Sequence, residues 1–149
     1  MAPDQVAQVA DEANLRGQIA ERVRAIRARD LDAVLVGYAP EVMTFDVISP
    51  LVNQGVDAVR KRLSDWFGSF ASDIEYNLLH VAITLSGDVA FDHHLTHVRG
   101  TSLKGDEIDM WFRETIGYRK RENRWLVTHQ HSSVPFDMTT GKAQLDLKP

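Results

Sequence analysis

Residues 74–85 (IEYNLLHVAITL) and 89–99 (VAFDHHLTHVR) carry the strongest indication of the fold. Apolar side chains, many of them β-branched or aromatic, recur there with a period close to two, which is typical of a strand that buries one face. Only Ser86, Gly87 and Asp88 separate the two stretches. Because such a short polar turn joins antiparallel neighbours, we expect a hairpin.

Two further strands of the same kind follow. Residues 107–121 and 124–134 repeat the pattern, with a polar turn at residues 122–123 between them and a connection over residues 100–106 before them. Short connections favour strands that are neighbours in space. The second half of the chain therefore predicts an antiparallel meander of four long strands.

The first half of the chain has a helical period instead. Leu15, Ile19, Val23 and Ile26 fall at intervals of four, four and three residues. This spacing predicts a helix over residues 11–29 that lays one face on a core.

Two more helices and one strand complete the first half. We expect a short helix over residues 31–38 with Asp30 as its N-cap, a strand over 42–48 and a third helix over 55–70. Three helices and one early strand, followed by four long strands, predict an α+β fold in which a curved sheet wraps around the helices.

Length and composition define the class of protein. The 149 residues fit one domain, and we expect a flexible N-terminus over 1–10, the domain over 11–135 and a surface tail over 136–149. The net charge of −4 gives no reason to expect nucleic acid or an anionic membrane as a partner. There is no cysteine, no leader-like start and no long apolar run, so we expect a cytoplasmic protein.

Particular residues within 11–135 resemble the nuclear transport factor two-like superfamily, and most closely its ketosteroid isomerase and SnoaL-like branches. The residues that carry this resemblance are Asp30-Leu31-Asp32, Tyr38-Ala39, Asp46, Gly55, Gly87-Asp88, Arg113-Glu-Thr115 and the stretch 125–133. The resemblance implies a cone-shaped, mainly antiparallel α+β barrel of the cystatin-like kind. Superfamily members include enzymes, scaffolds and binding modules, so fold alone does not assign a function.

Asp46 is the first candidate for chemistry. It lies among strand-forming apolar residues, and a buried carboxylate can act as a general base. The resemblance places it where ketosteroid isomerases hold their proton-moving aspartate, but it places Arg22 at the oxyanion tyrosine and a position at or near Thr115 at the oxyanion acid. The alternative for Asp46 is a hydrogen-bonded acid at a strand end.

Two arginines need anionic partners. Arg22 lies at the edge of the apolar helical stripe, so it either pairs with a protein carboxylate or meets an anion of a ligand. Arg113 shares one strand face with Asp109, Trp111 and Thr115. We expect this face to line a pocket and the apolar face at 108, 110, 112 and 116 to form a subunit interface. An Asp109–Arg113 ion pair is the alternative.

Five of the six histidines fall in the last strands. His129 and His131 share a face, and a metal ion held with a third ligand such as His93 or Asp92 is the less favoured alternative to hydrogen bonds in or beside the pocket. The resemblance points Ser132 inward and both histidines outward, unless a bulge reverses this. We therefore expect no metal. The full set of predicted binding residues is Arg22, Trp66, Phe91, His93, Asp109, Trp111, Thr115, His129, His131 and Ser132, and the predicted catalytic pair is Asp46 and Arg113.

These residues lead to one hypothesis and two rivals. The first is a homodimeric, cofactor-free isomerase, cyclase or dehydratase in which Asp46 removes a proton beside a carbonyl of a hydrophobic molecule and Arg113, Arg22 or a histidine steadies the oxyanion. The second is a non-catalytic module that holds a carboxylate-bearing or apolar molecule. The third is an association domain that works through its sheet surface.

Overall fold

Six strands form one mixed sheet in the computed structural model, which describes all residues 1–149. The strands occur in the order β2-β1-β6-β5-β4-β3 across the sheet. Their bounds are Tyr38–Phe45 for β1, Asn53–Gln54 for β2, Glu75–Ser86 for β3, Val89–Thr101 for β4, Glu107–Arg121 for β5 and Arg124–Ser133 for β6. The four long strands confirm the predicted meander, whereas the two-residue β2 was not predicted.

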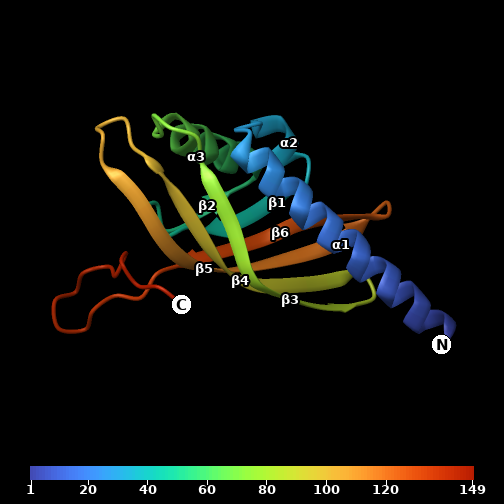
Figure 1. Cartoon of the computed structure of the whole chain (residues 1–149). Coiled ribbons are helices and arrows are strands. Elements are labelled where there is room, and N and C mark those ends of the chain that lie inside the picture. Colours follow the sequence, from blue (N-terminus) through green and yellow to red (C-terminus); the bar gives the residue numbers. More distant parts are fainter.

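The sheet is strongly curved (Figure 1). All neighbouring strands are antiparallel except β1 and β6, which pair in parallel. The register shifts between Leu79 and Ala82 in β3, where His80 has a φ of 58°, and between Gly117 and Tyr118 in β5. Bulges of this kind bend a strand and increase its twist, so they help the sheet to close around its contents.

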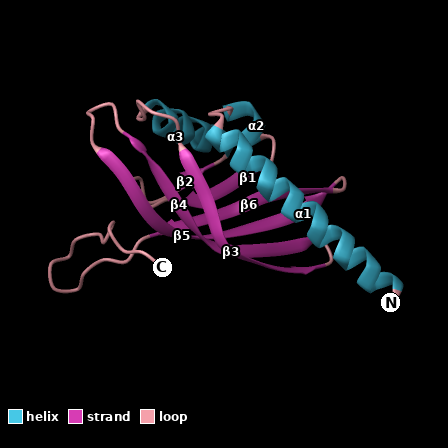
Figure 2. Ribbon diagram, viewed as in Figure 1, coloured by secondary structure: helices cyan, strands magenta, loops and turns pink.

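Three helices lie on the concave side of the sheet (Figures 1 and 2). They are α1 (Pro3–Arg27), α2 (Leu31–Leu35) and α3 (Val56–Gly68). The side chain of Asp30 accepts a hydrogen bond from the backbone N–H of Ala33 at 3.0 Å, which confirms it as the N-cap of α2. This arrangement is the predicted α+β architecture.

The start of α1 differs from the prediction. The helix begins at Pro3, so residues 3–10 are helical where we expected a flexible terminus. Proline is favoured in the first turn because its missing N–H has no partner to lose there, and the N–H of Ala2 donates to Gln5 Oε1 at 3.0 Å. Residues 1–10 are all exposed, and this part of α1 extends beyond the sheet (Figure 1). A pattern that depends on burial therefore could not reveal it.

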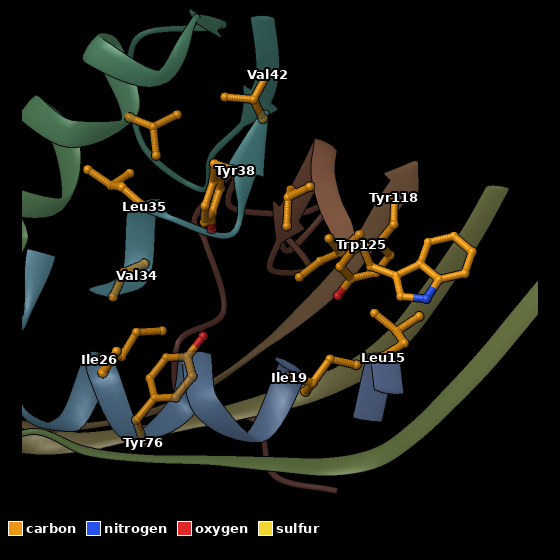
Figure 3. Close-up of a cluster of buried hydrophobic side chains, with 14 of the residues drawn as sticks. Leu15, Ile19, Ile26, Val34, Leu35, Tyr38, Val42, Tyr76, Tyr118 and Trp125 are labelled. Carbon is orange, nitrogen blue, oxygen red and sulfur yellow. The ribbon is translucent and has the colours of Figure 1, made fainter. Parts of the chain in front are cut away.

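The core joins α1 and α2 to the concave face of the sheet. Figure 3 shows Leu15, Ile19 and Ile26 along one side of α1, close to buried side chains of other elements. Leu15 is fully buried and Trp125 is 1% exposed, and each buried side chain of this kind stabilises the fold by roughly 1.5–3 kcal/mol. No helix combines the length and the apolar character that crossing a membrane requires.

Candidate functional site

A cavity of about 350 Å³ lies between the helices and the concave face of the sheet. Of its 22 lining residues, 14 are hydrophobic, so it favours an apolar guest. The aromatic part of the wall comes from Phe45, Trp66, Phe70 and Phe112. The other eight lining residues are polar or charged, Arg22, Thr44, Asp46, Arg62, Ser69, Glu114, Gln130 and Ser132, and the hydroxyls of Tyr38 and Tyr76 add to them.

The face of β5 that lines the cavity is the apolar one. Ile108, Met110, Phe112 and Glu114 contribute to the wall. Asp109, Trp111, Arg113 and Thr115 lie on the opposite face, so the expectation that they line the pocket is wrong. The physical reason is that side chains alternate along a strand and the more apolar row lies beneath the helices.

The outer face holds its own interactions. The imidazole of His97 stacks on Trp111 with ring centroids 4.3 Å apart, and its Nε2 lies 2.7 Å from Asp109 Oδ1. The Asp109–Arg113 ion pair, which was the alternative, is absent, because Arg113 Nε donates instead to Ser133 Oγ at 3.1 Å. These contacts place Arg113 outside the cavity and away from any ligand there.

Four other predicted residues also lie away from the cavity wall. Phe91 is 44% exposed, and His93 and His131 are exposed. His129 Nδ1 lies 2.8 Å from the carbonyl oxygen of Met43. His129 and His131 pack edge-on against Phe45, and no group of three or more histidine or carboxylate side chains is placed to hold a metal ion.

Asp46 lies in the cavity wall, directly after β1. Its Oδ2 is 2.8 Å from Nε of Arg62 on α3, and its Oδ1 accepts the backbone N–H of Val47 at 2.6 Å. The contact with Arg62 is an ion pair rather than a well-aligned hydrogen bond. The two side chains are only 21% and 20% exposed, so the pair lies at the edge of the cavity and is partly accessible from it.

Arg22 lies in the wall on the α1 side and is 9% exposed. Its Nη1 donates to the hydroxyl of Tyr118 at 3.2 Å, and it forms no ion pair with any carboxylate. Burial disfavours the cation, but attraction to Tyr118, Tyr38 and Tyr76 in the phenolate forms that they take at high pH outweighs burial and raises the pKa of Arg22. The guanidinium is therefore charged, and a hydroxyl takes the place of the carboxylate that the sequence led us to expect.

Glu114 is the functional candidate that the sequence analysis missed. Five side chains donate to its carboxylate: Tyr76, His94, Thr96, Gln130 and Ser132. Burial alone would raise its pKa, but the hydrogen bond and charge of His94, with Arg22 and Thr96, lower the pKa to about 2. The sequence contains an indication of this role. Successive side chains of a strand point to opposite faces of the sheet, so either Glu114 or its neighbour Thr115 must face the cavity.

His94 and Asp92 continue this polar cluster behind the wall. His94 Nδ1 lies 2.5 Å from Asp92 Oδ1, and its Nε2 lies 3.3 Å from Glu114 Oε1. Both ring nitrogens face carboxylates, so both must carry protons to donate. Burial lowers the pKa of His94, but its hydrogen bonds to Asp92 and Glu114 outweigh burial and raise it. The imidazolium is thus the form that this cluster stabilises.

Three tyrosines are bound to the same cluster. Tyr118 donates to Asp92, Tyr76 donates to Glu114, and Tyr38 donates to Gln130 Oε1 at 2.6 Å. Burial raises the pKa of Tyr38 to about 12 and also raises those of Tyr76 and Tyr118. All three phenols therefore stay protonated and act as donors near neutral pH.

Comparison with known proteins identifies the family. A profile of the SnoaL-like domain matches residues 17–137. The chain belongs to the SnoaL-like family. A search of curated protein sequences finds no significant match.

Solved structures agree with this assignment. An NTF2-like protein of unknown function from Pseudomonas putida is 31% identical, with a TM-score of 0.86 over 95% of this chain and 98% of the other. An NTF2-like protein with a cystatin-like fold from Novosphingobium aromaticivorans has a TM-score of 0.77 at 14% identity, covering 92% and 90% of the two chains. A ketosteroid isomerase-like protein from Erwinia carotovora has a TM-score of 0.69 at 20% identity, covering 81% and 93%. The last two show likeness of fold.

Four charged side chains line the cavity of this SnoaL-like protein: Arg22, Asp46, Arg62 and Glu114. Asp46 is a carboxylate whose two oxygens each have one partner, so lone pairs remain to accept a proton. Arg22 is a cation with unused donors, whereas Glu114 is saturated by five donors and held ionised. Proton acceptance and binding of an anionic oxygen are thus the two chemical capacities of this wall.

Proposed function

We propose that this SnoaL-like protein binds a hydrophobic, carbonyl-bearing small molecule in the cavity and removes a proton from the carbon beside the carbonyl. The observation that carries the proposal is the presence of the Asp46 carboxylate in the wall of a mainly apolar cavity. An apolar wall desolvates the acid and the guest together, which favours proton transfer. Phe45, Trp66 and Phe70 would contact the hydrophobic body of the molecule.

Arg62 has a defined part in this proposal. Its ion pair fixes the orientation of the Asp46 carboxylate, whose remaining lone pairs can accept a proton. Glu114 is excluded as the base because its carboxylate is fully hydrogen-bonded and its pKa is about 2. Asp46 is therefore the acid of the cavity wall with capacity for a proton.

Deuterium exchange tests the proposal without knowledge of the natural substrate. The probe is 1-tetralone, a bicyclic ketone, whose C2 protons are followed by proton NMR in deuterated buffer. We expect the protein to accelerate exchange and Asp46→Asn to reduce the acceleration by roughly 10²- to 10⁴-fold, the range of a general base. Asp65→Asn, in an exposed pair with Lys61 on the same helix as Arg62, is the control. Unchanged exchange in Asp46→Asn would show that Asp46 is not the base.

A non-catalytic binding module is the second candidate, favoured by the presence of Arg22 in the same wall. It differs from the first in one result. The protein would bind the ketone with the same affinity before and after Asp46→Asn, and neither form would accelerate exchange.

We also propose that the outer sheet face pairs with a second copy of the chain. The face is uncovered by helices and carries the exposed Phe91 and the half-buried Trp111. It holds both Asp109 and Arg113, so a two-fold pairing can bring opposite charges together. Sedimentation velocity should give a dimer that Trp111→Glu dissociates and that Val36→Glu, at the exposed C-cap of α2, leaves intact. A monomeric wild-type protein would contradict the pairing.

A further inference from the structure

The Arg22 guanidinium has more donors than the protein uses. A guanidinium has five N–H donors, and Arg22 makes one hydrogen bond, to Tyr118. Its Nε and Nη2 have no protein partner. The polar side-chain atoms that are fully buried without a hydrogen-bond partner belong to Asn53, Arg62 and Trp125, so Nε and Nη2 of Arg22 are not fully buried. The free donors of Arg22 are thus accessible from a hollow inside the protein.

Two hollows border Arg22. One is the main cavity of about 350 Å³, and the other, of about 40 Å³, lies on the side of Gln18 and Trp125. The smaller one has room for about one water molecule. A ligand can therefore meet Arg22 only from the main cavity.

A chain of hydrogen bonds holds Arg22 in place. Tyr118 donates its proton to Asp92, so its oxygen is left to accept from Arg22. Asp92 in turn is held by His94, which bridges to Glu114. Every member of this chain is buried, so the guanidinium is preorganised rather than free to move.

The charges of the buried cluster cancel. Arg22 and protonated His94 are positive, and Asp92 and Glu114 are negative. The Asp92 carboxylate lies on the far side of Tyr118 from the guanidinium, and the Glu114 carboxylate is saturated by other donors. Arg22 borders the mainly apolar main cavity, where a charged acceptor forms the stronger hydrogen bond.

We propose that Arg22 recognises an anionic oxygen of the ligand, either a carboxylate or the enolate oxygen formed from a carbonyl group. This inference rests on the proposed function, because it places the ligand in the same cavity. It gives the ligand two ends: a hydrophobic body against the aromatic wall and an oxygen terminus at Arg22. Tyr118 and Asp92 are positioning residues that act through Arg22.

Calorimetric binding of a matched pair of probes tests whether Arg22 binds a carboxylate. Naphthalene-2-carboxylate and 2-naphthamide share a shape and differ in charge. We expect the wild-type protein to prefer the carboxylate by roughly 10- to 100-fold, the range for hydrogen bonds to charged groups. Arg22→Met should lose this preference and still bind the amide, whereas Arg24→Met, on the exposed side of the same helix, should retain it.

Deuterium exchange of 1-tetralone tests whether Arg22 binds the enolate oxygen. Arg22→Met should slow exchange, because the enolate oxygen loses its partner, whereas Asp46→Asn should slow exchange and leave the preference for the carboxylate intact. Equal affinities for carboxylate and amide, together with unchanged exchange in Arg22→Met, would overturn the inference while leaving the cavity as a binding site. If neither probe bound, the proposed function and this inference would fail together.

A measurement on the wild-type protein keeps the test independent of the folding of Arg22→Met. An added anion is tolerated best while His94 is protonated, so carboxylate affinity should fall as pH rises through the titration of His94, and amide affinity should not. The groups that face His94 or its two carboxylate partners are Asp92 and Thr96 from β4, Glu114 and Tyr118 from β5, Tyr76 from β3, Gln130 and Ser132 from β6, and Arg22 from α1 through Tyr118. Parallel pH profiles for both probes would contradict the assignment.

Discussion

Glu114→Gln removes the charge of the most heavily hydrogen-bonded carboxylate in the protein. The pKa of Glu114 is lowered from 4.5 to about 2 in the folded state, since the donors around it outweigh the effect of burial. At about 1.4 kcal/mol per pH unit, this difference stabilises the folded state by about 3 kcal/mol at neutral pH. The carboxamide also brings its own donor among five others, which adds to the loss.

The pH dependence of this stabilisation has a definite sign. Because the folded pKa lies below the unfolded one, the contribution is complete above pH 4.5 and is lost as pH falls through about 2. Urea unfolding should give Glu114→Gln a free energy about 3 kcal/mol lower at pH 7, with a smaller difference at pH 3. In thermal unfolding, this loss corresponds to a melting temperature about 6–12 °C lower.

Glu41→Gln provides the control. Its carboxylate also pairs with an arginine, Arg121, but the pair is exposed, so the change should have little effect on stability. If Glu114→Gln unfolds like the wild-type protein at pH 7, or if both lose stability equally between pH 4.5 and 2, Glu114 is not the ionised centre of the cluster.

Three other changes test the charge of His94, the packing at Gly100 and the N-cap of α2. The pKa of His94 is raised above 6.5 in the folded protein. Its protonation therefore stabilises the fold fully below pH 6.5, and this stabilisation is lost as pH rises through the pKa of His94 in the folded protein. His94→Gln should flatten the resulting decline in the free energy of unfolding above pH 6.5. A Cβ at Gly100 would lie 2.8 Å from the Phe70 ring, so Gly100→Ala should cost about 1–3 kcal/mol in urea unfolding, and Gly117→Ala, with 3.7 Å of clearance, should cost less. Asp30→Ala removes the N-cap of α2 and should lower the melting temperature by an amount equivalent to about 1 kcal/mol.

Local patterns predicted the elements of this fold because each has a strong period or a clear end. The period-two runs located the four long strands, and Asp30 marked the start of α2. Two features gave no such pattern. The first turns of α1 bury no side chain, and β2 is two residues long, so neither has a hydrophobic period.

The candidate site was harder to predict because it depends on which strand face lies beneath the helices. Asp46, Arg22, Trp66 and Ser132 were identified and do line the cavity. The face of β5 that carries Arg113 was predicted to line the cavity, and this was wrong. The prediction failed because the apolar face of the same strand was assigned to a subunit interface. The Glu114 cluster joins residues from β3, β4, β5 and β6, and the sequence alone does not bring these side chains together.

A crystal structure of the protein with naphthalene-2-carboxylate tests the central claim most directly. The account predicts the naphthalene ring packed against Trp66 and Phe70 inside the cavity, with a carboxylate oxygen at about 3 Å from the Arg22 guanidinium. A ligand bound on the outer face of the sheet, or a cavity closed by the protein's own side chains, would contradict it.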